Sequence, residues 1–140
     1  MIAVAAAALT VTAITLYTIM LQNPGNVTSI QTVAIEAYWD TSLTNKVTTI
    51  NWGSIEAGTT KNVTIYLLNA GITDIRLSMN TTNWSPQNAS QHITLNWDYQ
   101  NQTINPNQQL KTTLTLNASP TTQGITSFSF DATITATQNQ

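Results

Sequence analysis

The hydrophobic pattern divides this chain into two parts of different character. Residues 1–21 are apolar, aromatic or threonine throughout, carry no charge, and end at Gln22-Asn23-Pro24-Gly25. From residue 31 onward, apolar and polar residues alternate in short runs bounded by Asn, Gly, Pro and Ser. We therefore predict an apolar N-terminal helix over residues 1–22, a hinge over 23–30 and a β-domain over 31–140.

The predicted helix has the composition of a segment that is buried on all sides. A 21-residue helix would be about 31 Å long, enough to cross a bilayer's hydrocarbon core or to line the inside of a filament. Its first half is rich in alanine, which lets helices approach closely, and a helix that is apolar on every face has to be buried on every face. We expect copies of the same helix to bury one another. The expected assembly residues are Ile2, Val4, Ala7, Val11, Ile14, Leu16, Tyr17, Ile19, Met20 and Leu21.

Three other readings of this segment can be compared with the sequence. A secretory signal peptide fits poorly, because no Lys or Arg precedes the apolar run and no small-x-small cleavage site follows it. A single membrane span is a better alternative, although the first basic residue is Lys46 and the flank that usually orients a span is missing. An extended segment that completes a neighbouring chain's sheet is also possible, but the alanine-rich start favours helix over strand.

The alternation in the second part predicts about seven short β-strands. The longest covers residues 125–137, where Phe128 and Phe130 begin an apolar face and the intervening residues are Ser, Thr or Asp. Asn69-Ala70-Gly71 separates two such runs and indicates a hairpin turn. Seven strands with turns between them are typical of an immunoglobulin-like sandwich of two antiparallel sheets. The predicted fold class is thus α+β, mainly β: one long apolar helix followed by this sandwich.

Composition excludes several classes of function. Only 7% of the 140 residues are charged and the net charge is −2, so no basic surface is available to neutralise the phosphates of a nucleic acid. Surface polarity comes instead from 27 Thr, 15 Asn, 11 Gln and 9 Ser, whose side chains do not titrate in acid. Cysteine is absent, so no disulfide, thiolate catalyst or Cys-based metal site can form.

Residues suited to catalysis are few and scattered. His92 is the only imidazole, and it precedes an apolar strand run, where an edge or surface histidine is expected. The six Asp and Glu residues lack calcium-loop spacing, and no serine lies in a nucleophile motif. We therefore expect a protein that is not an enzyme and that holds no cofactor or metal.

Asn-x-Ser/Thr sequons recur along the chain, either as glycosylation sites or as by-products of a composition rich in Asn, Ser and Thr. Each is an acceptor for an N-linked glycan if the chain is exported in an organism with that machinery. The seven sequons begin at Asn26, Asn62, Asn80, Asn83, Asn88, Asn101 and Asn117.

The order of these features resembles the mature pilins of archaeal type IV filaments: an uncharged apolar N-terminal helix, a short hinge, and a Thr- and Asn-rich β-domain with sequons. The resemblance implies that a basic leader is removed, that the helix waits in the membrane and then bundles with its copies, and that glycosylated domains form an outer sheath. The expected function is a structural subunit of an extracellular cell-surface filament that adheres to surfaces or cells. The alternative is a single-span, membrane-anchored β-sandwich binding module on the cell surface.

Overall fold

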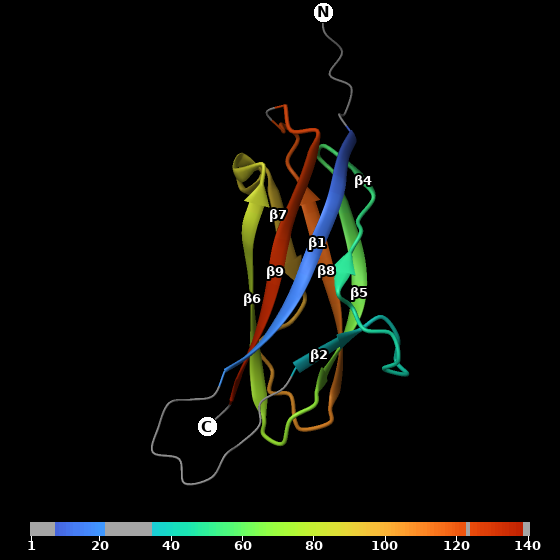
Figure 1. Cartoon of the computed structure of the whole chain (residues 1–140), viewed down its shortest axis with the longest axis vertical. Helices are drawn as coiled ribbons and strands as arrows, with labels where there is room; N and C mark the ends of the chain where they lie inside the picture. Colours follow the sequence, from blue (N-terminus) through green and yellow to red (C-terminus); the bar gives the residue numbers. More distant parts are fainter. Residues whose placement is uncertain (1–7, 22–34, 123, 139–140) are drawn as a thin grey trace, which may run out of the picture.

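The chain folds into two β-sheets packed face to face, as the computed structural model shows for residues 8–21, 35–122 and 124–138 (Figure 1). The four-stranded sheet contains, in spatial order, β2 (Ile35–Tyr38), β5 (Thr60–Asn69), β8 (Gln109–Ala118) and β7 (Ile93–Trp97). The five-stranded sheet contains β3 (Thr49–Ile50), β1 (Ala8–Leu21), β9 (Ser127–Gln138) and β6 (Ile75–Ser85), with β4 (Ser54–Glu56) also paired to β1. A short 3-10 helix, η1 (Gln87–Gln91), follows β6.

The prediction of a sandwich agrees with this structure, but the prediction of a long N-terminal helix is wrong. Residues Ala8–Leu21 form strand β1, and no α-helix occurs among the described residues. Two physical reasons explain the difference. Half of the 14 residues of β1 are Thr, Val or Ile, which favour extended backbone, whereas most of the alanine-rich stretch precedes residue 8 and lies outside the described residues. In addition, β9 offers a long ladder with which β1 pairs.

The strand order is that of a constant-type immunoglobulin sandwich, whose sheets have the orders A-B-E-D and C-F-G. In this chain β2, β5, β8 and β7 occupy places A, B, E and D, and β6 and β9 occupy places C and F. Place G is occupied by β1, which comes from the opposite part of the sequence and runs parallel to β9. A hairpin from F to G would have made this pair antiparallel, so β1 enters the fold as a strand from elsewhere in the chain.

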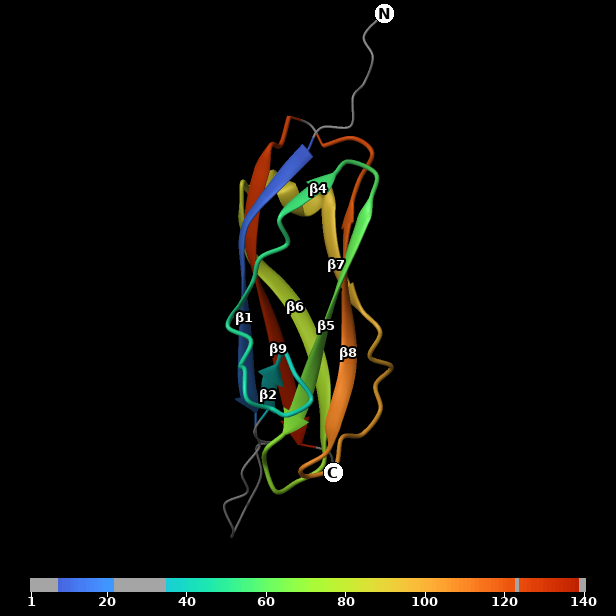
Figure 2. The ribbon, with the colours of Figure 1, turned by 90° about the vertical axis from the view of Figure 1, so that its right-hand side faces the viewer.

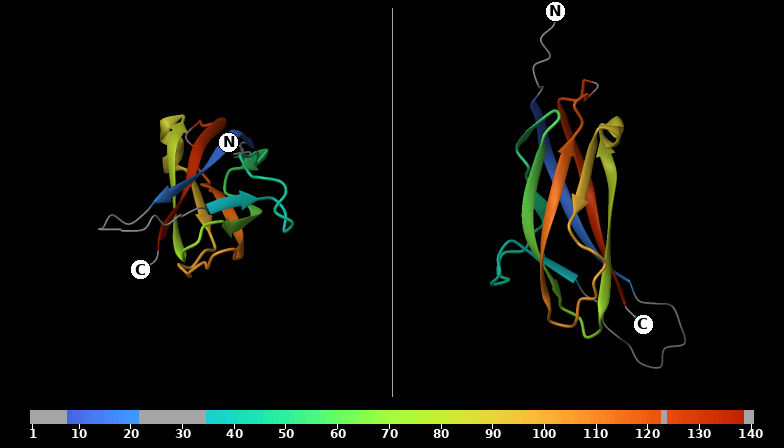
Figure 3. Two further views of the ribbon diagram at one scale, coloured as in Figure 1. Left: turned by 60° about the horizontal axis from the view of Figure 1, so that its bottom comes forward. Right: turned by 180° about the vertical axis from the view of Figure 1, so that it is seen from behind.

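The core lies between the two layers, which are seen from the side in Figure 2. Strand β9 alternates strictly between buried and half-buried residues over most of its length, and its buried row is at most 2% exposed. The members of this row are Phe128, Phe130, Ala132, Ile134 and Ala136. The facing sheet includes β8, the orange strand in the right-hand view of Figure 3. Its residues Leu114 and Leu116 are fully buried. The apolar residues that alternate with polar ones in the sequence of β9 are therefore the residues that are buried.

Trp84 lies at the end of β6, between the polar residues Asn83 and Ser85. A register shift between Thr82 and Ser85 inserts an extra residue there, with Asn83 at a φ of +56°. The shift allows Trp84 to stack on Phe130, with 4.1 Å between ring centroids. The bulge thereby adds an aromatic ring to the edge of the core.

The predicted hairpin at Asn69 is a connection between the two sheets, because β5 and β6 belong to different layers. Asn69 is fully buried, and its side-chain amide donates hydrogen bonds to the carbonyls of Thr73 (2.8 Å) and Ile104 (2.9 Å). Its side-chain oxygen accepts a hydrogen bond from the backbone N–H of Gly71 (3.0 Å). The side chain thus supplies the partners that a hairpin ladder would otherwise have supplied.

Replacing Asn69 with alanine should destabilise the sandwich strongly. The change leaves one buried N–H and two carbonyl groups without these partners, and we expect the free energy of unfolding to fall by about 2–4 kcal/mol. Urea unfolding followed by tryptophan fluorescence measures this value. Asn96→Ala, at an exposed position of β7, is the matched control and should change stability by less than about 0.5 kcal/mol. Equal effects of the two changes would contradict the assigned role of Asn69.

Candidate functional site

The candidate functional site is the place that β1 occupies in the five-stranded sheet, which we call the groove. β1 lies between β9 on one side and β3 and β4 on the other. Eleven register pairs join it to β9, from Thr10 with Ser127 to Leu21 with Thr137. Within this ladder Leu16 pairs with Ala132 and Met20 with Ala136, and both alanines belong to the fully buried row of β9. The groove is therefore bounded by one long parallel ladder and two short antiparallel ladders.

Most of the predicted assembly residues lie in this strand. The structure places Val11, Ile14, Leu16, Tyr17, Ile19, Met20 and Leu21 in β1, and Ile2, Val4 and Ala7 lie outside the described residues. For the seven residues in β1 the predicted role as the buried face of a helix is wrong, because they belong to a strand, in which successive side chains point to opposite faces of the sheet. Every second residue of β1 from Ile14 to Met20 pairs with a buried residue of β9, whereas Tyr17 pairs with the half-buried Thr133.

The entry and exit of β1 follow from its register. Its last residue, Leu21, pairs with Thr137, which lies opposite Arg76 near the start of β6. The first residue of β2, Ile35, pairs with Asn69 at the end of β5. The end of β5 and the start of β6 are joined by one connection and therefore lie at the same end of the sandwich. Since Leu21 lies near the start of β6 and Ile35 lies beside the end of β5, β1 ends and β2 begins at this same end (Figure 1). The 13 residues from 22 to 34 are the only covalent link between the two strands.

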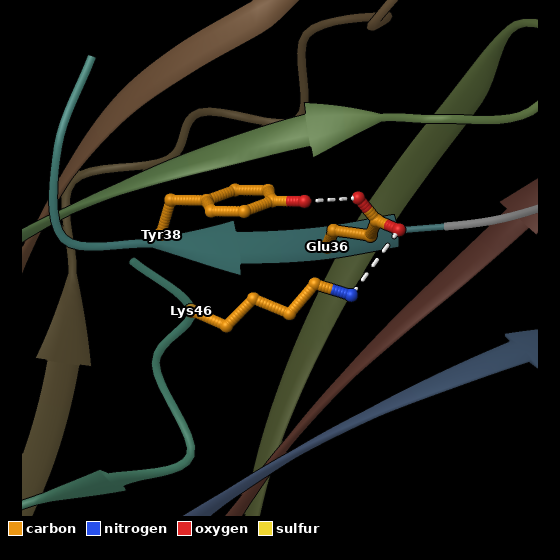
Figure 4. A network of polar contacts seen from close by, with 3 residues as sticks. All are labelled: Glu36, Tyr38 and Lys46. Carbon is orange, nitrogen blue, oxygen red and sulfur yellow. Dashed lines mark hydrogen bonds and ion pairs between the residues drawn. The ribbon is translucent and has the colours of Figure 1, made fainter. Parts of the chain in front are cut away.

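Glu36, Tyr38 and Lys46 form a polar cluster at β2, close to this end of the sandwich (Figure 4). The Tyr38 hydroxyl donates a hydrogen bond to Glu36 Oε2 (2.5 Å), and Lys46 Nζ lies 3.6 Å from Glu36 Oε1. The hydrogen bond to Glu36, aided by burial, raises the pKa of Tyr38 above its ordinary value of 10.0. Lys46 also lies 6.0 Å from the centroid of the Tyr38 ring. The cluster holds the loop after β2 against the strand.

Asp40 organises the same loop. Its carboxylate accepts hydrogen bonds from the Thr44 hydroxyl (2.5 Å), the Thr44 backbone N–H (3.1 Å) and the Asn45 backbone N–H (3.0 Å). The Thr44 hydroxyl and the Asn45 N–H lower the pKa of Asp40 below its ordinary value. The carboxylate is therefore held ionised as a structural acceptor.

The described residues bring no catalytic group together. They contain no cluster of three His, Asp or Glu side chains that could hold a metal ion. His92 is half-buried at the end of η1, and its backbone N–H donates to the carbonyl of Ala89. The hollow beside η1 is lined by Gln87, Asn88, Ser90 and Gln91, whose side chains are polar and uncharged.

The predicted glycosylation sites are spread over the fold. Asn26 lies outside the described residues, whereas Asn62 lies on β5, Asn80 and Asn83 on β6, Asn88 in η1, Asn101 in the β7–β8 loop and Asn117 on β8. Asn62, Asn80, Asn88 and Asn101 are exposed, and the side-chain oxygen of Asn62 accepts a hydrogen bond from the Thr115 hydroxyl (2.8 Å). Asn83 is exposed too, but its Nδ2 donates a 2.7 Å hydrogen bond to Asp131 Oδ2, and Asn117 is half-buried. The sequons therefore differ in how freely they present an amide nitrogen.

Comparison with known proteins adds no assignment, because no family model, curated protein or solved structure matches this chain. Across the part of the chain that the structure describes, no helix is long and apolar enough to span a membrane.

Replacing Glu36 with glutamine should make Tyr38 easier to ionise. The neutral phenol is favoured by its hydrogen bond to the carboxylate, so in the native protein this bond stabilises the fold at neutral pH and is lost as pH rises through the raised pKa. We expect the Tyr38 midpoint to move down toward 10.0 in the variant. Tyrosinate absorbance near 295 nm, with Tyr38→Phe used to assign the transition, measures it. An unchanged midpoint would contradict the assigned cause.

Glycan occupancy should follow these differences in exposure. We expect modification at Asn80, Asn88 and Asn101, and none at Asn83, whose amide nitrogen is engaged with Asp131. Glycopeptide mapping of protein from its native source, with and without chemical deglycosylation, tests each position. An intact mass equal to the unmodified chain would contradict glycosylation altogether, and a glycan on Asn83 with the three others bare would contradict the ranking.

Proposed function

We propose that this chain is the structural subunit of an extracellular filament whose neighbouring chains are joined by exchange of β1. One observation carries the proposal: the seventh place of the sandwich is filled by an N-terminal strand that is connected to the rest of the fold through residues 22–34 alone. A strand held in this way can complete the sheet of another chain by pairing its backbone with β9 of that chain.

The contacts of β1 supply the affinity that such a joint requires. In this ladder each register pair aligns backbone donors and acceptors, and eleven pairs connect β1 to β9. The strand also lies beside a continuous buried row that includes Phe128 and Phe130. Withdrawal of β1 would expose this row and leave β9 with a free edge, which strongly favours the filled groove.

The surface of the chain supports an extracellular location. Charged residues make up only 7% of the sequence, and Thr, Asn, Gln and Ser provide polarity that does not depend on pH. Glycans at the exposed sequons would add further polar cover without a charge. Adhesion to surfaces or cells is the role that we propose for the resulting filament, with the chain itself and its N-linked glycans as partners.

A second candidate is a monomeric cell-surface binding module in which β1 stays in its own sandwich. The observation in its favour is that β1 ends and β2 begins at the same end of the fold, so that 13 residues can connect them within one chain. The two candidates differ in the state of the native protein: a module is monomeric, whereas a filament can be sheared from cells, pelleted and seen by electron microscopy.

A charge placed in β1 should block assembly only at alternate positions. Leu16 pairs with the fully buried Ala132, so Leu16→Asp puts a carboxylate at a register position of the core, at a cost of several kcal/mol. We expect the yield of sheared, pelleted filaments to fall at least about tenfold. Tyr17→Asp, one residue further along β1 and paired with the half-buried Thr133, is the matched control and should retain filaments.

Two results would contradict the proposed function. The first is a native, unsubstituted chain that is monomeric by sedimentation and yields no filaments after shearing. The second is normal filaments from the Leu16→Asp variant, because assembly would then not depend on the groove.

A further inference from the structure

We infer that, in the filament, β1 enters the neighbouring sandwich antiparallel to β9, opposite to its direction in the structure. The inference rests on the proposed function, namely that neighbouring chains exchange β1, and it names the geometry of that exchange. Parallel pairing within one chain is then the closed, unassembled form of the subunit.

Exchange without reversal brings identical ends together. In the parallel arrangement Leu21 leaves β1 at the end that holds the β5–β6 connection, and β2 of the same chain begins at that end too. Two chains that swap β1 in this direction therefore face each other through the same end. Such a contact is isologous, and mutual exchange fills both grooves and uses both strands, so the product is a closed dimer.

A filament requires different ends to meet, and the length of the connection limits how this can happen. The 14 residues of β1 extend about 46 Å along the sandwich at about 3.3 Å per residue. In a head-to-tail stack with parallel pairing, β1 would leave the neighbouring sandwich at its far end. Residues 22–34 would then have to span the length of one whole subunit to reach β2 of their own chain. Thirteen residues reach at most about 47 Å when fully extended, so the stack would demand a completely stretched connection. A reversed β1 leaves at the opposite end, where the connection joins adjoining subunits directly.

Reversal also improves the longest ladder of the strand. In the structure β1 makes eleven parallel register pairs with β9, whereas its antiparallel ladders with β3 and β4 contain only two and three pairs. If β1 is reversed, its eleven-pair ladder with β9 becomes antiparallel, and its short ladders with β3 and β4 become parallel. Antiparallel pairing is slightly more stable per residue, and the assembled form therefore gains over the closed one.

The sequence of β1 is compatible with both directions. Strand side chains have a period of two, so rotating the strand about Leu16 keeps alternate residues on the same sheet face. With Leu16 kept opposite Ala132, Ile14 moves from Phe130 to Ile134, another residue of the buried row. The parallel register, by contrast, contains an irregularity between Val11 and Ala13. Alternate residues of β1 thus keep register positions opposite the buried row of β9 in either orientation.

The absence of cysteine from the chain makes the direction measurable by disulfide trapping. The pair Tyr17→Cys with Thr133→Cys joins direct neighbours of the parallel ladder. The pair Ala13→Cys with Thr135→Cys reports the reversed strand, because Thr135 pairs with Ile19 in the parallel ladder and lies about 20 Å from residue 13 along it. That distance is far beyond the reach of a disulfide, which needs Cα atoms within about 7 Å. Combining Ala13→Cys with Thr133→Cys or Thr137→Cys covers registers shifted by two residues.

Each variant is oxidised both as the isolated subunit and as filaments sheared from cells, and then separated without reductant. We expect the parallel pair to close within single chains of the isolated subunit, and one of the reversed pairs to give a ladder of linked chains from filaments. A ladder from the parallel pair, with none from the reversed pairs, would overturn the reversal and leave strand exchange standing. Dimers alone from the parallel pair, or no link between chains in any variant, would overturn both the reversal and the proposed function.

Discussion

The pairing of β1 with β9 is the constraint on which the rest of the structure depends. β9 carries the buried row that includes Phe128, Phe130 and Ile134, and it pairs with β6 along its other side. With β1 in place, β9 is a central strand with both edges satisfied, and β3 and β4 gain a strand on which to pair. Without it, the longest apolar face of the sandwich would end at an open edge.

This arrangement distinguishes the strands that form the frame of the sandwich from β1, the strand that we propose joins neighbouring chains. The six strands β2, β5, β6, β7, β8 and β9 supply an immunoglobulin-like frame that is tied internally by the buried Asn69 and by the Trp84 stack on Phe130. The seventh strand, β1, comes from the other end of the sequence and is held by its backbone ladders with β9, β3 and β4. In the exchange that we propose, β1 would pair with β9 of a neighbouring chain, because backbone hydrogen bonding does not depend on which chain supplies the strand.

The alternation from residue 31 onward predicted the sandwich because half-buried strands need a period of two, and the buried positions of β8 and β9 follow it. The N-terminal segment was wrongly predicted as a helix. Apolar residues follow one another without interruption at both of its ends, and periodicity cannot distinguish a helix from a strand in such a run. A useful signal was present in its Thr, Val and Ile content. Asn69 was wrongly predicted as part of a hairpin turn for another reason: Ile104, whose carbonyl accepts a hydrogen bond from its side chain, lies 35 residues away in the sequence.

The sequence by itself determined the composition of the surface, the lack of disulfides, the positions of the sequons and the strands that alternate. These properties are local, since each depends on residue type or on neighbours within a few positions. Only the tertiary structure decided that Ala8–Leu21 is a strand, that it takes the seventh place of the sandwich, and that it runs parallel to β9. Those choices depend on an edge more than 100 residues away in the chain, and an apolar segment takes the conformation that satisfies its backbone against whatever partner the fold presents.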